Sequence, residues 1–249
     1  MSSGVADVLP RIRDRLSRRS REWRRRQRRD DAHLAALLRE TLAGEDRVVD
    51  VGAHRGDFLA LAYEHAPLGA HLALEALPDF AARLRERFPQ ATVVECAVGA
   101  AAGRARFFRP VTMPAWSGLR EQEYPGDTEV EVIDVEVRPL DDVVPAGAPV
   151  KLLKIDVEGG ERDVLLGARG LLARDRPVVY FEYAHVHADP HGVTPALLHE
   201  TLAAAGYELF GLSGDGPHDA ARFAELAREA HASGYDRRAE TNWVARPAG

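Results

Sequence analysis

Short apolar runs alternate with longer segments of helical spacing from residue 47 onward. This alternation is typical of a parallel sheet with crossover helices, because strands covered on both faces need no polar side. The pattern predicts seven strands, at residues 47–52, 71–76, 92–98, 150–156, 177–183, 207–213 and 240–247. It predicts helices at residues 57–66, 78–88, 159–169 and 194–206.

The segment between the third and fourth strands differs in kind. Residues 103–110 and 129–140 alternate polar and apolar positions and predict two extra antiparallel strands, with residues 113–127 as a loop between them. Long loops beside the ligand crevice of a sheet usually shape substrate access. We therefore expect the insertion, residues 103–138, to shape the substrate site.

The N-terminal segment predicts a helix over residues 8–42, with Leu9, Ile12, Leu16 and Trp23 near one face. Eleven arginines fall within the first 29 residues, although the whole chain has a net charge of -6. We expect two units: a basic amphipathic arm, residues 1–44, and an α/β domain, residues 45–249.

The arm either packs on the domain or on a second subunit, or contacts an anionic membrane surface or a nucleic acid. No base-reading motif accompanies its arginines, so no specific nucleic-acid binding is expected.

Composition adds few further constraints. A chain of 249 residues with 45% apolar residues can bury a full core, and its single cysteine, Cys96, allows no intramolecular disulfide. No apolar run approaches the roughly 18 residues of a membrane span, and the N-terminus lacks the apolar core of a secretory signal. We expect a soluble, cytoplasmic protein.

Acidic residues occupy the ends of the predicted strands. Ligands of an open parallel sheet bind outside the carboxyl ends of its strands, so these positions are the ones to inspect. The acids found there are Asp50, Glu75, Asp156, Glu158 and Glu182. Alternatively, each of them caps a helix or pairs with an arginine.

The turn after the first strand, in "VVDVGAHRGDF" (residues 48–58), has the spacing D-x-G-x-x-x-G. A dinucleotide fold uses G-x-G-x-x-G to bring backbone amides onto a pyrophosphate, and the third glycine is missing here. The turn therefore favours a phosphate-free nucleoside that carries an amino group. Gly52 lets the backbone approach such a ligand, and Asp50 can accept a hydrogen bond from its ammonium, directly or through water.

The next strand ends extend this interpretation. Glu75 is placed to accept both ribose hydroxyls, and Cys96 with Ala97 would lie beside the base. A nucleoside that bears an amino acid and no phosphate is S-adenosylmethionine.

Several stretches together resemble the FkbM family of S-adenosylmethionine-dependent methyltransferases. They are "VVDVGAHRGDF", "LALEALPDFAARL", "VVECAVGAAAGRARFF", "VEVRPLDDVV" and, most specifically, "VKLLKIDVEGGERDVLLGA". The resemblance implies a Rossmann-like class I methyltransferase fold: a seven-stranded, mostly parallel sheet with its last strand antiparallel and helices on both faces. It also implies methylation of a hydroxyl on a sugar, glycolipid or secondary metabolite.

The resemblance also assigns residues. It implies cofactor contacts at Asp50, Gly52, Ala53, Gly56, Glu75, Ala97 and Asp156. Val157 and Glu158 follow Asp156, between cofactor and acceptor. Two positions depart from the family: His54 stands where asparagine is common, and Gly160 where histidine is frequent.

A base must remove the proton of the acceptor hydroxyl, and a carboxylate or an imidazole can do so. The candidates are Asp156, Glu158, Glu182 and His185. His185 and His187 follow the fifth strand, and with Asp189 and His191 they also fit a solvated loop or a metal site. We assign no metal ligand.

Lys154 lies in the middle of a central strand, where a charge needs a partner. The chain has only one other lysine, Lys151, which suggests that a compact ammonium is required at position 154. Our hypothesis is that Lys154 pairs with Glu158 or Glu182 and orients that acid. In the insertion, Trp116, next to Ser117, either stacks on a sugar or anchors its loop.

The sequence thus predicts an S-adenosylmethionine-dependent O-methyltransferase with a small-molecule hydroxyl acceptor. Two alternatives remain open. One is a nicotinamide-dependent oxidoreductase on a Rossmann sheet. The other is a non-catalytic module that binds a membrane or a partner through the basic arm and keeps a degenerate cofactor site.

Overall fold

A seven-stranded sheet forms the centre of the protein in a computed structural model, which describes residues 28–124, 126–233 and 241–249. The order of its strands is β3-β2-β1-β7-β8-β10-β9. Their bounds are β1 (Arg47–Val51), β2 (Leu72–Glu75), β3 (Thr92–Glu95), β7 (Val150–Ile155), β8 (Val178–Glu182), β9 (Tyr207–Gly211) and β10 (Asn242–Pro247).

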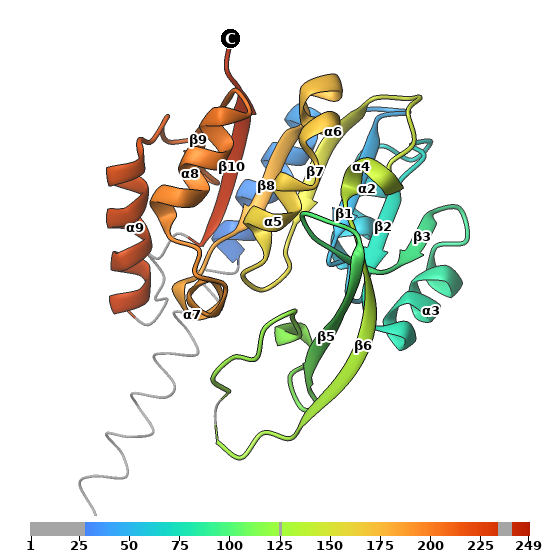
Figure 1. Cartoon of the computed structure of the whole chain (residues 1–249). Helices are drawn as coiled ribbons and strands as arrows, with labels where there is room; N and C mark the ends of the chain where they lie inside the picture. The colour runs from blue at the N-terminus through green and yellow to red at the C-terminus, as the bar shows by residue number, and fades with distance from the viewer. Residues whose placement is uncertain (1–27, 125, 234–240) are drawn as a thin grey trace, which may run out of the picture.

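The pairing of these strands is mostly parallel. β1 pairs in parallel with β2 and β7, β2 with β3, and β7 with β8. β10, the last strand of the chain, is antiparallel to both β8 and β9. The predicted fold class is therefore confirmed, and the parallel strands all end at the lower edge of the sheet in Figure 1.

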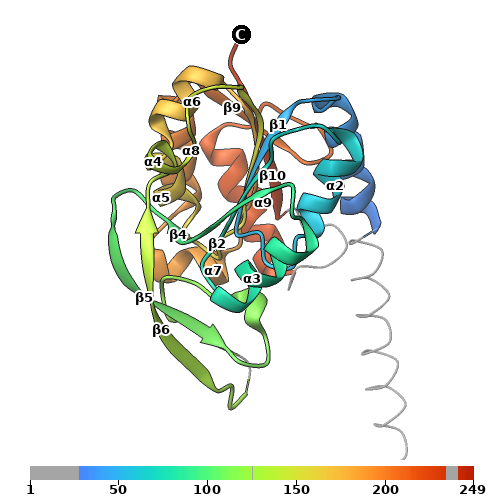
Figure 2. The same ribbon diagram turned by 90° about the vertical axis from the view of Figure 1, so that its right-hand side faces the viewer.

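Helices cover both faces of the sheet (Figure 2). One face carries the helix at residues 28–41, α2 (Asp57–His65) and α3 (Pro78–Arg87). The other face carries α4 (Leu140–Val143), α5 (Glu161–Leu166), α6 (Arg169–Asp175), α8 (Pro195–Ala204) and α9 (Ala220–Ala232). The short helices α7 (His185–Ala188) and η2 (Asp189–His191) follow β8.

The insertion and β4, which precedes it, form a second, three-stranded sheet in the order β4-β6-β5. Its strands are β4 (Ala97–Val98), β5 (Gly103–Pro110) and β6 (Val130–Arg138), and the short helix η1 (Pro114–Trp116) follows β5. The strand predicted at residues 92–98 is thus divided at Cys96, and only its first half stays in the main sheet. The β5–β6 hairpin projects beyond the lower edge of that sheet (Figure 1).

One predicted helix needs correction, and one helix was not predicted. The helix predicted at residues 159–169 is two helices, α5 and α6, separated around Gly167. A Cβ at Gly167 would lie 2.2 Å from the carbonyl oxygen of Gly99, so a glycine is required where these two segments of the backbone touch. The helix α9 was not predicted; it buries Phe223, Ala227 and Ala230 on one face.

The described part of the predicted arm packs on the domain. In and just after the helix at residues 28–41, Leu37, Leu38 and Leu42 are buried, and Arg246 of β10 forms a two-bond ion pair with Glu40, at 3.1 Å for each bond. The rest of the arm, residues 1–27, lies outside the described residues. Every helix within the described ranges is too short or too polar to cross a membrane.

His71 ties β1 to the loop before β2. Its buried ring accepts a hydrogen bond at Nδ1 from the Val48 amide (3.2 Å) and donates one from Nε2 to the Ala66 carbonyl (2.9 Å). An amide only donates and a carbonyl only accepts, so this ring must be neutral. Burial accordingly lowers the pKa of His71 below its ordinary value.

We expect His71 to make the protein sensitive to acid. The unfolded chain protonates this ring near pH 6.5, before the folded chain does, so the stability it contributes is present above that pH and is lost as pH falls below it. His71→Phe should weaken the pH dependence of the free energy of unfolding by about 1.4 kcal/mol per unit of pKa shift. The same variant should lower the free energy of unfolding at pH 7.5 by about 1–3 kcal/mol, because it leaves the Val48 amide unpaired. Urea unfolding at pH 7.5 and 5.0 measures both, and an unchanged pH dependence would contradict the prediction.

Candidate cofactor and acceptor site

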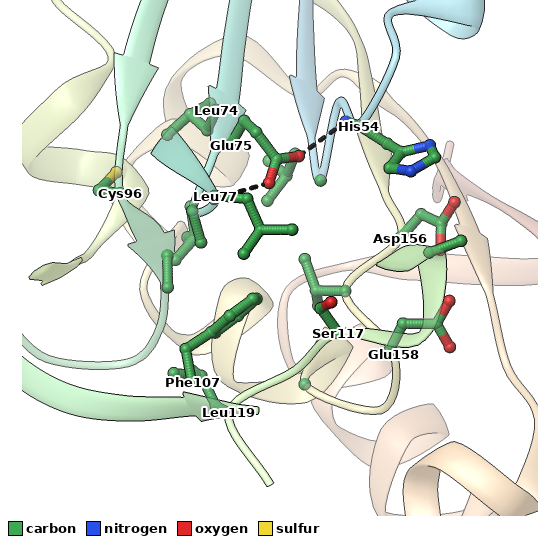
Figure 3. A pocket seen from close by; sticks show the side chains of 18 of the residues that line it. His54, Leu74, Glu75, Leu77, Cys96, Phe107, Ser117, Leu119, Asp156 and Glu158 are labelled. Carbon is green, nitrogen blue, oxygen red and sulfur yellow. Dashed lines mark hydrogen bonds between the residues drawn. The ribbon is translucent and has the colours of Figure 1, made fainter. Parts of the chain in front are cut away.

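A cleft with about 600 Å³ of empty space opens at the carboxyl ends of β1, β2 and β7, under the insertion (Figure 3). The sheet side contributes Gly52, His54, Glu75, Ala97, Asp156 and Glu158, among others. The insertion contributes Phe107, Pro114, Ala115, Ser117 and Leu119.

The turn after β1 uses its amides internally. The amides of Gly52 and Ala53 both donate to the Leu74 carbonyl, at 2.9 and 3.1 Å. The His54 amide donates to Glu75 Oε2 at 2.7 Å, and the Gly56 amide donates to the Ala53 carbonyl at 2.7 Å. These four amides therefore offer no cradle for a phosphate, in contrast to a dinucleotide-binding turn.

Gly52 brings this turn against the chain that leaves β7. Its φ is 75°, and a Cβ added there would lie 1.9 Å from the carbonyl oxygen of Asp156. Any side chain would collide with that backbone. Gly52 is thus required by the protein's own packing as well as by its position in the cleft.

Glu75, at the end of β2, points its carboxylate into the cleft (Figure 3). Oε2 accepts the His54 amide, and Oε1 accepts the Leu77 amide at 2.9 Å. Burial raises the pKa of Glu75, although these two bonds oppose the shift. Each carboxylate oxygen keeps a further lone pair, so the side chain can still accept two hydroxyl donors.

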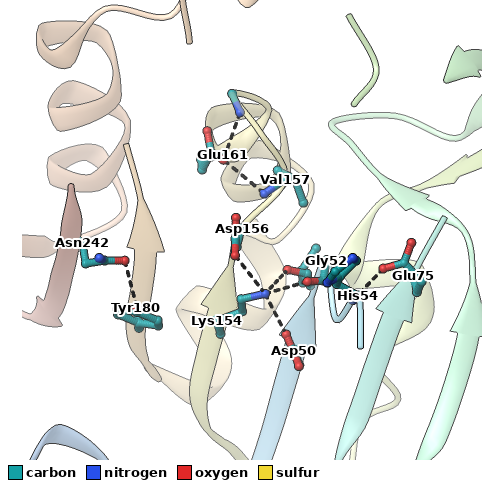
Figure 4. A network of polar contacts seen from close by, with 12 residues as sticks. Asp50, Gly52, His54, Glu75, Lys154, Asp156, Val157, Glu161, Tyr180 and Asn242 are labelled. Atoms are coloured by element: carbon teal, nitrogen blue, oxygen red, sulfur yellow. Dashed lines mark hydrogen bonds and ion pairs between the residues drawn. The ribbon is translucent and has the colours of Figure 1, made fainter. Parts of the chain in front are cut away.

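Lys154 joins β1 to β7 beneath the cleft (Figure 4). Its Nζ lies 3.1 Å from Asp50 Oδ1, 3.5 Å from Asp156 Oδ2 and 2.6 Å from the Gly52 carbonyl oxygen. Burial alone would lower the pKa of Lys154, but the two carboxylates outweigh it and raise the pKa. The predicted pairing with Glu158 or Glu182 is wrong, because Asp50 is the register partner of Lys154 on the neighbouring strand.

Three of the predicted cofactor residues do not line the cleft. Asp50 is fully buried against Lys154, which corrects the expected contact between its carboxylate and a ligand ammonium. Ala53 packs in the core beside α2 and α3. A Cβ at Gly56 would lie 2.5 Å from the Phe88 ring, so this glycine serves helix packing.

One end of the cleft is apolar. Leu77, Cys96, Ala97, Phe107 and Leu119 line it, from β2 through β4 to the insertion. Burial raises the pKa of the Cys96 thiol to about 11, so the thiol stays protonated at neutral pH. This end can receive a flat, uncharged ring.

Glu158 stands at the opposite end, in a strained conformation. Its φ is 56°, and among the described residues only two others besides glycines have a left-handed φ, His54 at 47° and Arg176 at 48°. Two of the three thus line this cleft, and such strain clusters at functional sites. Burial, and then the charge of Asp156, raises the pKa of Glu158 well above its ordinary value, and its Oε2 is buried without a hydrogen bond.

Behind Glu158 lies a closely packed cluster of acids. It comprises Asp156, Glu158, Glu161 and Glu182, with His187 beside them. Burial, and then the negative charges of Asp156 and Glu158, raises the pKa of Glu182 to about 8. Burial also raises the pKa of Glu161 to about 7, while its Oε1 accepts the amides of Val157 and Gly159, each at 3.2 Å. Of these four acids, Asp156 and Glu158 also line the cleft.

The two histidines of α7 face different surroundings. His185 contacts Tyr183 and His231 and lies 3.6 Å from Asp189, away from the cleft, which corrects its predicted role as a base. His187 instead places Nδ1 at 3.0 Å from Glu158 Oε2. No three metal-ligating side chains gather into a metal site within the described residues.

The insertion contacts Glu158 and His187 directly. Gln122 donates from Nε2 to the Glu158 carbonyl (3.0 Å), and its Oε1 lies 2.7 Å from His187 Nδ1. The Trp116 ring meets the His187 ring edge-on at 5.2 Å, while Ser117 donates its hydroxyl to the Pro114 carbonyl. Of the two predicted roles of Trp116, this contact favours the anchor.

Four residues of the site were not assigned to it from the sequence. Gln122 and Glu161 were not singled out, whereas His54 was noted only as a departure from the family and His187 only as part of a solvated loop or metal site. Glu161 and His54 belong to the quoted motifs, so their position beside an assigned residue was a usable signal. Nothing in the sequence around Gln122 indicates that it reaches Glu158, since the contact joins residues 36 positions apart.

The sheet order, the antiparallel last strand and the cleft at the strand ends together define a class I methyltransferase fold. A family model for the methyltransferase FkbM domain matches residues 50–209, well over half of the chain. The protein therefore belongs to the FkbM methyltransferase family, as its motifs indicated.

Solved structures of methyltransferases are similar to the chain at low sequence identity. A methyltransferase FkbM from Methylobacillus flagellatus KT is 19% identical, with a TM-score of 0.48 over 81% of this chain and 43% of that one. This chain thus spans less than half of that protein's length. A putative rRNA-methylase from Clostridium thermocellum is 8% identical, with a TM-score of 0.50 over 88% of this chain and 95% of that one. Aeropyrum pernix fibrillarin, in complex with S-adenosyl-L-methionine, is 14% identical, with a TM-score of 0.45 over 86% of this chain and 73% of that one. No curated protein matches the sequence.

Proposed function

We propose that this methyltransferase uses S-adenosylmethionine to methylate a hydroxyl of a small molecule such as a sugar, a glycolipid or a secondary metabolite. The carrying observation is that one cleft joins an acidic strand end, Glu75, to a strained and mostly buried acid, Glu158. The first suits a ribose and the second suits a hydroxyl that must lose a proton.

The residues present fit this cofactor. Glu75 would accept the ribose hydroxyls, and the apolar end around Cys96 and Ala97 would hold the adenine. His54, whose Nε2 is buried without a partner, and Asp156 would meet the amino acid part. The acidic cleft suits a cationic ligand, and the internally bonded turn amides disfavour the pyrophosphate of a nicotinamide dinucleotide.

When bound, the cofactor supplies an activated methyl group on its sulfonium. Glu158 would accept the acceptor's hydroxyl proton at a carboxylate oxygen, and its raised pKa makes it a stronger base than an ordinary carboxylate. Asp156 and Lys154 hold the end of β7 against the turn, which keeps the two halves of the site aligned.

We expect S-adenosylmethionine and S-adenosylhomocysteine to stabilise the full chain, and NAD to leave its melting temperature unchanged. Ligand at about 100 times Kd adds about 2.7 kcal/mol, or about 5–11 °C for a protein of this size. Glu75→Gln should weaken the affinity about 10-fold to 150-fold, because it loses charge-assisted hydrogen bonds.

Thermal shift and calorimetry measure these effects, with Glu95→Gln as the matched control. Glu95 ends the neighbouring strand β3 in register with Glu75, but it is exposed and pairs with Arg85. Stabilisation by NAD alone would favour the oxidoreductase. No shift with any of the three ligands would favour the non-catalytic module.

A further inference from the structure

We propose that Gln122 of the insertion is a positioning residue, which fixes the tautomer of His187 and thereby keeps the Glu158 carboxylate ionised and ready to accept a proton. The inference rests on the proposed function of Glu158 as the base. It gives the insertion a part in the chemistry in addition to covering the cleft.

The orientation of the Gln122 amide follows from its two partners. Its side chain is buried and lies between the Glu158 carbonyl oxygen and His187 Nδ1. A backbone carbonyl can only accept, so the amide nitrogen must face Glu158 and the amide oxygen must face His187. The Nδ1 atom of His187 must then carry a hydrogen.

This hydrogen also serves Glu158. Burial lowers the pKa of His187, so the ring is neutral and has a single N–H, at Nδ1. The same Nδ1 lies 3.0 Å from Glu158 Oε2, although its hydrogen bond goes to Gln122 and the contact with the carboxylate lacks hydrogen-bond geometry. The positive end of an N–H dipole this close to a carboxylate favours its charged form, so His187 in this tautomer opposes protonation of Glu158.

Without Gln122 the opposite tautomer becomes accessible. A hydrogen on Nε2 would leave a lone pair at Nδ1 facing Glu158 Oε2, and two acceptors at 3.0 Å repel unless Glu158 takes up a proton. The other charges near Glu158 reinforce this effect. Asp156 and Glu161 favour the protonated form, Lys154 opposes it, and Glu182 faces His187.

The backbone around this pair is held independently of Gln122. A Cβ at Gly159 would lie 1.9 Å from the His187 carbonyl oxygen, so the loop after β7 rests directly on α7. The Trp116 ring also packs against His187. Replacing the Gln122 amide should therefore change which nitrogen of the His187 ring carries the hydrogen, while the ring itself stays in place.

Long-range proton–nitrogen NMR of the full chain with labelled histidine tests the tautomer without any acceptor. The His187 signal is assigned by its loss in His187→Asn. We expect the Nδ1–H form in the wild type and in Gln122→Glu, which keeps an acceptor oxygen, and the Nε2–H form in Gln122→Leu. A wild-type Nε2–H form, or a Gln122→Leu spectrum equal to the wild type, would overturn the proposal whether or not the protein transfers methyl groups.

The pH dependence of methyl transfer gives the second readout. In Gln122→Leu the acidic limb of the rate profile should move up by about one pH unit, a tenfold loss of rate on that limb, while the affinity for S-adenosylhomocysteine is unchanged. The matched control is Glu123→Gln, an exposed residue of the same loop, which should keep the wild-type profile. A uniform loss of rate with no displacement of the limb would mean that Gln122 only supports the fold.

Discussion

Glu158→Gln should lower kcat for methyl transfer by about 100-fold to 10,000-fold, because an amide of the same shape cannot take the proton of the acceptor hydroxyl. Binding of S-adenosylhomocysteine should be nearly unchanged, since Glu75 and the apolar end of the cleft lie at its other side. The loss of rate can be measured by mass spectrometry, as the gain of one methyl group on any acceptor that the wild type methylates.

The pH profile sharpens this test. The pKa of Glu158 is raised by burial and by Asp156, so the wild-type rate should rise with pH through a pKa above that of an ordinary glutamate. The variant should lack this limb. If Glu158→Gln keeps the wild-type kcat while Glu182→Gln loses it, the base is Glu182 of the acidic cluster and the assignment of Glu158 fails.

Lys154→Met should lower the free energy of unfolding by about 3–5 kcal/mol, because it leaves the fully buried Asp50 charged and unpaired. For a chain of this size the melting temperature should fall by about 6–20 °C. Adding Asp50→Asn should recover part of the loss. Lys154→Arg should not restore the wild type, since a guanidinium cannot occupy the place of an ammonium between Asp50 and the Gly52 carbonyl.

The chain provides its own control for this variant. Lys151, the other lysine, lies on the same strand but is exposed, so Lys151→Met should change stability by about 0.5 kcal/mol or less. Denaturant unfolding of the three lysine variants compares them directly. Equal effects at positions 151 and 154 would show that the ion pair with Asp50 contributes nothing specific.

The fold was predictable where a segment's own pattern decides its structure. Every strand of the main sheet lies within a run predicted from its apolar residues. The failures depend on distant contacts or weak patterns. A single apolar run could not reveal that the strand divides between two sheets at Cys96. Nor could it reveal that the Gly99 carbonyl leaves no room for a side chain at Gly167, where the predicted helix is interrupted. The helix α9 buries two alanines beside Phe223, which is a weak apolar stripe.

The site shows a similar limit. The sequence placed acids at one edge of the sheet, but it could not tell which of them faces the cleft. Asp50 and Lys154 share a register that β1, buried throughout, and β7, buried except at Lys151, do not specify from pattern alone. His185 and His187 lie two positions apart on the short helix α7, so they point about 160° apart, and only the structure decides which one meets Glu158.

The contact between Gly52 and the Asp156 carbonyl has a mechanical consequence. Under the proposed function, the half of the site that would hold the methyl donor and the half that would accept the proton share one backbone junction. Lys154 binds the Gly52 carbonyl at that junction, so neither half can shift alone. The insertion meets that rigid block through Gln122 and Gly118, whose added Cβ would stand 3.6 Å from the Glu158 carbonyl oxygen. Under that function, changes in the rest of the insertion could admit new acceptors without disturbing this block, whereas changes at Gln122, or at Phe107 and Leu119 of the apolar end, would alter the site itself.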